Sequence, residues 1–285
     1  MIVTVLVENT SISEDLEWEH GLSLYIETCG RALLFDMGGS GLFAKNAEKL
    51  GLDVSKAELA IVSHGHSDHG GGLGAFLEIN PSAPVYVSRG AFGHYCVLRT
   101  SGVMEYAGLN QDFAGESRLV FADRHLKIGK GLELFSDVHG TKWNPRVNDC
   151  LYEKTKDSSK SDDFEADAFS PDCFSHEQNL ILEENGKTYL FTGCAHAGIV
   201  NILERFREIR GAFPDEVIGG FHLSNPLTGE GEDPDTLDAI GRYLLETGAR
   251  FHTGHCTGAE PYERLKTLLG DRLFPLSTGY RYAGA

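Results

Sequence analysis

The chain has 285 residues, 41% of them hydrophobic, which is enough for a sizeable core, and one large α/β or sandwich domain can reach this length. Its formal net charge of −17 repels phosphate backbones and anionic membrane surfaces, so we expect neither nucleic acid nor membrane as a partner. No apolar stretch approaches the roughly 20 residues that span a bilayer, and the N-terminus lacks the features of a signal peptide. The six cysteines are dispersed, unlike a disulfide framework. We therefore expect a cytoplasmic protein with a small-molecule substrate, in an oligomeric state that the sequence leaves open.

The first half of the chain alternates predicted strands and helices. A helix is predicted between Ser40, as a possible cap, and Gly51 beyond its end. A second helical pattern covers 72–79. Runs rich in β-branched and apolar residues predict strands at 4–9, 22–28, 32–37, 57–63, 84–88, 118–122 and 132–138.

A change of composition follows at about 140–173, where the chain is polar, acidic and without hydrophobic period. We expect a long excursion over the surface, either a solvated insertion or a functional segment such as a lid. The whole chain, 1–285, is predicted to form a single domain that carries this segment as an insertion.

The second half of the chain shows the same alternation of predicted strands and helices as the first. Strands at 179–184 and 187–193 are predicted to form a hairpin around Asn185 and Gly186. Two amphipathic helices follow, one from about 199 and one capped by Asp233, with strands predicted at 216–223 and 249–258. Thr257 and Glu260 form a possible capping box for a last helix. Each half thus places a histidine-bearing loop between a strand and a helix, which predicts two halves packed face to face.

The stretch VSHGHSDHGGG, residues 62–72, concentrates metal-binding side chains at the end of a predicted strand. Because side chains alternate along an extended chain, His64 and His66 point to the same side. Asp68 and His69 follow a turn and can face a second point nearby. Two metal ions a few ångströms apart can share such ligands, as in two-metal hydrolases. Imidazole and carboxylate together favour zinc, with manganese or iron as alternatives.

This spacing, His-x-His-x-Asp-His after an apolar strand, resembles the signature of the metallo-β-lactamase superfamily. The resemblance extends over nearly the whole chain: LLFDMG with Asp36, LFTGC with Cys194 and TGHCTG with His255 are similar to further motifs of the family. It implies an αββα sandwich of two mixed β-sheets flanked by helices, with a dinuclear metal centre in a cleft at one edge.

Four motifs together resemble a narrower group within the superfamily: SHGHSDHGGG, FTGCAHAGI, GGFHL and TGHCTG. Its members are related to a dihydropterin synthase of methanopterin biosynthesis, which joins a pterin to a ribofuranosyl-aminobenzene phosphate. The resemblance indicates the chemical scaffold more strongly than the substrate.

The resemblance also implies how the ligands are divided. One metal takes the first two motif histidines and a third from a later loop, for which His176 and His196 compete. The second metal takes Asp68, His69 and His255, with Cys194 where most members have a bridging aspartate. A thiolate at that position favours zinc. The predicted ligands are His64, His66, Asp68, His69, His176, Cys194, His196 and His255.

The remaining polar residues receive other roles. Asp36 is expected to accept hydrogen bonds from the metal loop and so to orient ligand rings. Asp68 is also a catalytic candidate, as a receiver of the proton of a bridging water. His222 ends a predicted strand after two glycines and is predicted to contact substrate or transfer a proton. His252 is expected to be structural, and His20, His94, His125 and His139 to lie at the surface or in packing.

These observations favour a metal-dependent hydrolase in which a metal-bound hydroxide attacks a small ester, thioester or phosphoester. A pterin-coupling transferase is the second possibility. Di-iron redox chemistry and a non-catalytic metal or ligand sensor are the others.

Overall fold

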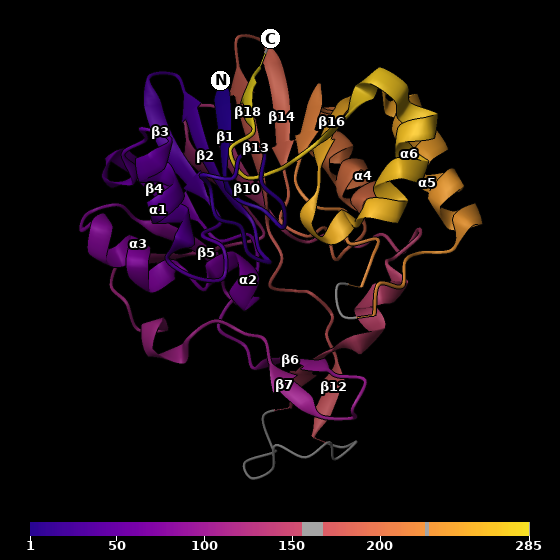
Figure 1. Cartoon of the computed structure of the whole chain (residues 1–285), viewed down its shortest axis with the longest axis horizontal. Helices are drawn as coiled ribbons and strands as arrows, with labels where there is room; N and C mark the ends of the chain where they lie inside the picture. The colour runs from indigo at the N-terminus through magenta and orange to yellow at the C-terminus, as the bar shows by residue number, and fades with distance from the viewer. Residues whose placement is uncertain (156–167, 226–227, 285) are drawn as a thin grey trace.

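The computed structural model describes residues 1–155, 168–225 and 228–284, and Figure 1 shows the arrangement of its elements. Two seven-stranded sheets lie face to face, with helices on the outer side of each. The expected αββα sandwich of two mixed sheets is confirmed. No helix among the described residues is long and apolar enough to cross a membrane.

The first sheet has the order β18-β1-β2-β3-β4-β5-β8, antiparallel from β18 to β3 and parallel from β3 to β8. Parallel pairing brings the ends of β3 and β4 to one edge of the sheet, where the metal loop begins. The strands are β1 (Ile2–Val7), β2 (Ser23–Thr28), β3 (Arg31–Phe35), β4 (Ala57–Ile61), β5 (Val85–Ser88), β8 (Leu119–Ala122) and β18 (Arg281–Ala283).

The second sheet has the order β17-β16-β15-β14-β13-β10-β9, and its strands β14 to β17 are parallel. The loops after β14, β15 and β16 carry His196, His222 and His255. The strands are β9 (His125–Gly129), β10 (Leu132–Phe135), β13 (Asn179–Glu184), β14 (Lys187–Phe191), β15 (Glu216–Ile218), β16 (Arg250–Thr253) and β17 (Leu273–Pro275).

Three apolar layers hold the sandwich together. Between the sheets, Phe35 of β3 and Phe191 of β14 have ring centroids 6.0 Å apart, and both side chains are fully buried. Outside the first sheet lie α1 (Leu42–Lys49) and α3 (Leu73–Ile79), and outside the second lie α4 (Ile199–Arg210), α5 (Pro234–Thr247) and α6 (Ala259–Leu269). Each helix buries its apolar face because the spacing of its hydrophobic residues follows the helical period.

A third, four-stranded sheet of order β12-β11-β6-β7 was not anticipated. Figure 1 shows it at the edge of the molecule where the short helix α2 (Ser67–Gly70) lies. Its strands are β6 (Tyr95–Leu98), β7 (Met104–Tyr106), β11 (Leu151–Lys154) and β12 (Phe169–Pro171). The segment predicted as an irregular excursion at 140–173 therefore contains a 3-10 helix, η3 (Arg146–Cys150), and two strands, while 156–167 lie outside the described residues.

Local predictions have mixed outcomes. Asn185 and Gly186 both have positive φ, 53° and 76°, as the predicted hairpin turn requires. Asp233 accepts from the backbone N–H of Asp235 and Thr236 and begins α5, as expected. The capping box at Thr257 is wrong, because α6 is preceded by Gly258 and has no side-chain cap.

Candidate metal centre

The metal loop begins where β4 ends and turns at once into α2. His66 keeps an extended backbone, with φ −93° and ψ 146°, before the chain turns. The glycines after it permit close packing against residues 37–40: a Cβ on Gly71 would lie 2.3 Å from the carbonyl oxygen of Gly39, and one on Gly72 would lie 2.4 Å from that of Met37. The strand, the turn and the glycines thus place four ligand-type side chains at one edge of the sandwich.

Asp36 directly follows β3, and its carboxylate binds residues of the metal loop. Its carboxylate accepts from the Ser63 backbone N–H at 2.7 Å, from the Ser63 hydroxyl at 2.8 Å and from His69 Nδ1 at 2.7 Å. The side chain is fully buried. The expectation that Asp36 accepts hydrogen bonds from the metal loop is confirmed.

One group of donor atoms contains Asp68, His69, Cys194 and His255, which could together hold a metal ion. His69 Nε2 lies 3.1 Å from Cys194 Sγ and 3.1 Å from His255 Nε2. Asp68 Oδ2 lies 3.2 Å from His255 Nε2 and 3.7 Å from His69 Nε2. Four ligands around a tetrahedral zinc ion, at about 2.0–2.3 Å from it, lie about 3.3–3.8 Å apart. The separation of 3.7 Å lies in this range and the other three are slightly shorter, so an ion would be held once these side chains move apart by a few tenths of an ångström.

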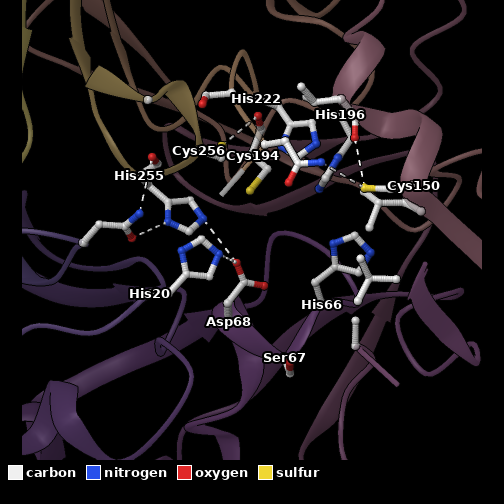
Figure 2. Close-up of a pocket in the computed structure, with 18 of the residues that line it drawn as sticks. His20, His66, Ser67, Asp68, Cys150, Cys194, His196, His222, His255 and Cys256 are labelled. Atoms are coloured by element: carbon white, nitrogen blue, oxygen red, sulfur yellow. Dashed lines mark hydrogen bonds and ion pairs between the residues drawn. The ribbon is translucent and has the colours of Figure 1, made fainter. Parts of the chain in front are cut away.

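A second group contains His64, His66 and His196. His196 Nε2 lies 3.3 Å from His64 Nε2, and the His66 and His196 ring centroids are 4.9 Å apart. Figure 2 shows Cys194 and His196 on one side of the site and Asp68 and His66 on the other. The two groups are neighbours, since Cys194 precedes His196 by two residues on the loop after β14.

His176 lies beside these groups with both of its ring nitrogens in hydrogen bonds. Its Nδ1 accepts from the Gly65 backbone N–H at 2.9 Å, and its Nε2 donates to Asp172 at 3.0 Å. Asp172 also lies 3.7 Å from His66 Nε2. The three side chains of His66, Asp172 and His176 form a buried group of their own. Of the two competing histidines, the structure brings His196 to His64 and His66.

In three imidazoles of these groups, an oxygen atom contacts Nδ1 on the side away from the cluster and so orients the ring. His255 Nδ1 lies 2.9 Å from Asn9 Oδ1 and His196 Nδ1 lies 3.0 Å from Asn148 Oδ1, while His64 Nδ1 lies 2.9 Å from the Ser63 hydroxyl. In each ring Nε2 is left to face the cluster. Metal-binding histidines characteristically have such partners on the other nitrogen. Asn9 and Asn148 were missed by the sequence reasoning, because both lie far from the motif histidines in the chain.

The electrostatics of the site favour a cation. Burial lowers the pKa of His69, but the carboxylates of Asp36 and Asp68 beside it raise the pKa to about 9. A positive charge is therefore stabilised between the two carboxylates. Burial and neighbouring histidines hold the pKa values of His64 and His196 well below the usual range. These two rings are neutral, which is the form that coordinates a metal.

His222 lies against the same groups without a partner for either ring nitrogen among the described residues. Its side chain is buried, its ring centroid is 4.1 Å from that of His196, and its backbone has a φ of 48°. The preceding glycines are explained by close contacts: a Cβ on Gly219 would lie 1.9 Å from the Thr192 carbonyl oxygen. Buried ring nitrogens without a hydrogen-bond partner need an explanation, and contact with a ligand in the adjoining cavity would supply one.

A cavity of about 620 Å³ opens beside the two groups, and Asp68, His66, Cys194, His196 and His222 are in its wall. His20 also lines it: its side chain is partly exposed, and its Nε2 lies 3.3 Å from Asp68 Oδ2. The loop before β2 folds over the metal loop, as the hydrogen bond from Leu22 N–H to the Asp68 carbonyl shows. That contact joins parts of the chain that no local pattern connects.

The model of the metallo-beta-lactamase superfamily matches residues 16–239. The chain belongs to this superfamily. The matched region of this metallo-β-lactamase superfamily member includes the metal loop, Cys194, His196 and His222, whereas His255 lies beyond it. The resemblance predicted from the motifs is confirmed.

Relatives of this superfamily member include two proteins of Methanocaldococcus jannaschii. The uncharacterised protein MJ0448 is 27% identical over 274 residues, covering 94% of each chain. A 7,8-dihydropterin-6-methyl-4-(β-D-ribofuranosyl)-aminobenzene-5′-phosphate synthase is 26% identical over 261 residues, covering 84% of this chain and 81% of that protein. A crystal structure described as Tm1679, a metal-dependent hydrolase of the β-lactamase superfamily, aligns with a TM-score of 0.77 and 25% identity over 100% of this chain and 99% of that one.

Proposed function

We propose that this protein is a metal-dependent hydrolase with a dinuclear centre that acts on a small ester, thioester or phosphoester. The observation that carries the proposal is the convergence of two adjacent groups of donor atoms on one cavity, with His255, His196, His64 and His69 oriented from behind. This arrangement is characteristic of metal sites whose ligands are fixed in advance.

One ion would be held by His64, His66 and His196 and the other by Asp68, His69, Cys194 and His255. Bound there, two zinc ions would supply a hydroxide at neutral pH and stabilise negative charge on the substrate. His176 does not enter this ligand set, because its nitrogens bind Gly65 and Asp172. We assign it, with Asp172, to the positioning of His66.

The protein's own side chains would then guide the protons. Asp68 faces the cavity and lies within 3.3 Å of His20 Nε2, which gives a route from the site toward solvent. His222 faces the cavity with free ring nitrogens and would donate a proton to the leaving oxygen or sulfur as its bond to the substrate breaks. The water adds its hydroxyl to the carbonyl carbon or phosphorus, so the products are an acid and an alcohol or thiol.

The test compares two variants. Asp68→Ala removes a proposed ligand, and the control Asp123→Ala removes an exposed carboxylate that pairs with Arg89 outside the cavity. Metal content is measured by elemental analysis, and turnover on phosphoester and thioester substrates. We expect about two ions per chain in the parent protein and in the control, and fewer ions with no turnover in Asp68→Ala while it stays folded. Full activity in Asp68→Ala contradicts the proposal.

A pterin-coupling transferase is a second candidate, supported by the similarity to the synthase from M. jannaschii. Turnover with a dihydropterin and none with simple esters would favour it. Two irons per chain would instead favour redox chemistry, and metal without any turnover a sensor.

A further inference from the structure

The third sheet forms one wall of the cavity, and the loops that carry the clusters form another. Val97 of β6 pairs with Leu151 of β11 on one side and with Glu105 of β7 on the other, and all three line the cavity. Directly paired residues of neighbouring strands point to the same face of a sheet. The other face of the sheet is closed by its own apolar cluster of Cys96, Met104, Ala168 and Phe169. One face of the sheet is therefore available to a ligand.

Arg99 follows β6 directly and lines the same cavity. It is the only lysine or arginine in the cavity wall as far as the described residues show, in a chain of net charge −17. Its Nε donates to Glu105, and the structure records no other side-chain partner for its guanidinium within the described ranges. The two terminal nitrogens remain for a ligand. A guanidinium with a free edge binds a carboxylate or a phosphate through paired hydrogen bonds.

One large aromatic side chain is exposed in the wall of this cavity. Trp18, in the loop before β2, is 61% exposed. Tyr106 of β7 pairs with Cys96 and so belongs to the other face of the sheet, where its ring lies 4.8 Å from that of His94. Covering a large aromatic ring is favourable, and such rings are typical of surfaces that bind planar groups. Trp18 lines the same cavity as Arg99 and adds an apolar, ring-binding component to the anion-binding one.

We propose that the substrate is a small molecule that combines a planar aromatic or heteroaromatic ring with an acidic group, carboxylate or phosphate, and that Arg99 binds the acidic group. The proposal rests on the proposed function for the place of the reaction, which lies at the metal clusters. Trp18 contacts the ring. Glu105 holds the guanidinium in position and partly offsets its charge.

The test measures binding by calorimetry with four probes: 2-naphthoate, naphthalene-2-phosphonate, the neutral 2-naphthamide, and acetate, which has no ring. The full-length protein is studied with its metal and, in parallel, after treatment with a chelator. The acids can form charge-assisted hydrogen bonds to the guanidinium and the amide cannot, so we expect the ring acids to bind about tenfold or more tightly than the amide. The stronger of the two acids identifies carboxylate or phosphate as the natural group.

Arg99→Gln is expected to remove the preference for acid over amide, and Arg99→Lys to retain part of it. Arg89→Gln is the matched control, because Arg89 forms an exposed ion pair with Asp123 and does not line the cavity. Glu105→Gln frees Arg99 and should strengthen acid binding. Trp18→Leu should weaken all ring probes equally without changing the acid preference.

Equal affinity for acid and amide in the parent protein overturns the proposal, as does an unchanged preference in Arg99→Gln. If Arg99→Gln does not fold, Glu105→Gln decides, and no gain in acid binding there overturns it. The preference for acid over amide should persist in chelator-treated protein, because binding to Arg99 requires neither metal nor turnover. A protein that binds ring acids through Arg99 but hydrolyses nothing would contradict only the proposed function.

Discussion

His69 Nδ1 lies 2.7 Å from a carboxylate oxygen of Asp36, and both side chains are fully buried. Asp36 has a φ of 59°, a left-handed backbone conformation that a structure retains only where its surroundings require it. Three further residues of the site, Ala195, His222 and His255, share this feature with φ of 60°, 48° and 51°. Four of the nine described non-glycine residues with positive φ therefore lie at the site, where this backbone conformation sets the direction of the side chains.

The Asp36→Asn variant should therefore bind metal more weakly without losing its fold. Asparagine tolerates the left-handed backbone, but it removes the negative charge that stabilises a cation at His69. Loss of such a supporting contact costs about 10- to 100-fold in metal affinity. Competition with a chromogenic chelator measures it, with the exposed Asp53→Asn as control. Unchanged affinity would mean that Asp36 acts only on the backbone of Ser63.

Cys194 should supply a thiolate to the metal, whereas Cys256 should not. Both cysteines are buried, and Cys256 Sγ lies 3.5 Å from the Cys194 carbonyl oxygen, yet Cys194 alone of the two joins the donor group with His69. In cobalt-substituted protein, the thiolate-to-cobalt charge-transfer band should disappear in Cys194→Ser and remain in Cys256→Ser. The reverse result would assign the sulfur ligand to Cys256.

His222→Ala should lower kcat by about 10²- to 10⁴-fold, the usual contribution of a general acid. The metal content should stay at the level of the parent protein, because His222 is outside the two ligand groups proposed. Elemental analysis of the variant separates the alternatives. Loss of one ion would show that His222 belongs to the ligands, as the group Cys194, His196 and His222 allows.

A stability prediction concerns Glu216, which joins the two sheets. Its Oε2 accepts from Tyr282 of β18 and lies 3.3 Å from His252 Nε2 of β16. Burial would raise the pKa of Glu216, but these two partners lower it below its usual value. A carboxylate with a depressed pKa stabilises the fold at pH values above its unfolded-state pKa of about 4.5. This contribution is lost as the pH falls through the folded-state pKa.

Glu216→Gln should consequently lower the free energy of unfolding by about 2 kcal/mol at pH 7, as for a lost hydrogen bond to a charged group. The difference from the parent protein should shrink as the pH falls below about 4.5. Urea unfolding at several pH values measures it. A difference that does not change with pH would show that packing, and not charge, explains the effect.

Much of the site follows from patterns that are local in the chain. The order strand, His64, His66, turn, Asp68 and His69 defines which side chains face one edge, because strand alternation and the turn operate within ten residues. The Asn185-Gly186 turn and the Asp233 cap are local for the same reason. These features, and the family that they indicate, were determined by the sequence itself.

Tertiary structure decided the rest, where partners lie far apart in the chain. The pairing of β11 with β6 joins residues more than fifty positions apart, so the polar composition of 140–173 did not indicate a sheet. The choice between His176 and His196 depended on Asp172 and Asn148, and the place of His20 on the fold of the loop over Asp68. Such contacts arise from the packing of whole elements, and a local residue pattern holds no information about which distant segment will meet it.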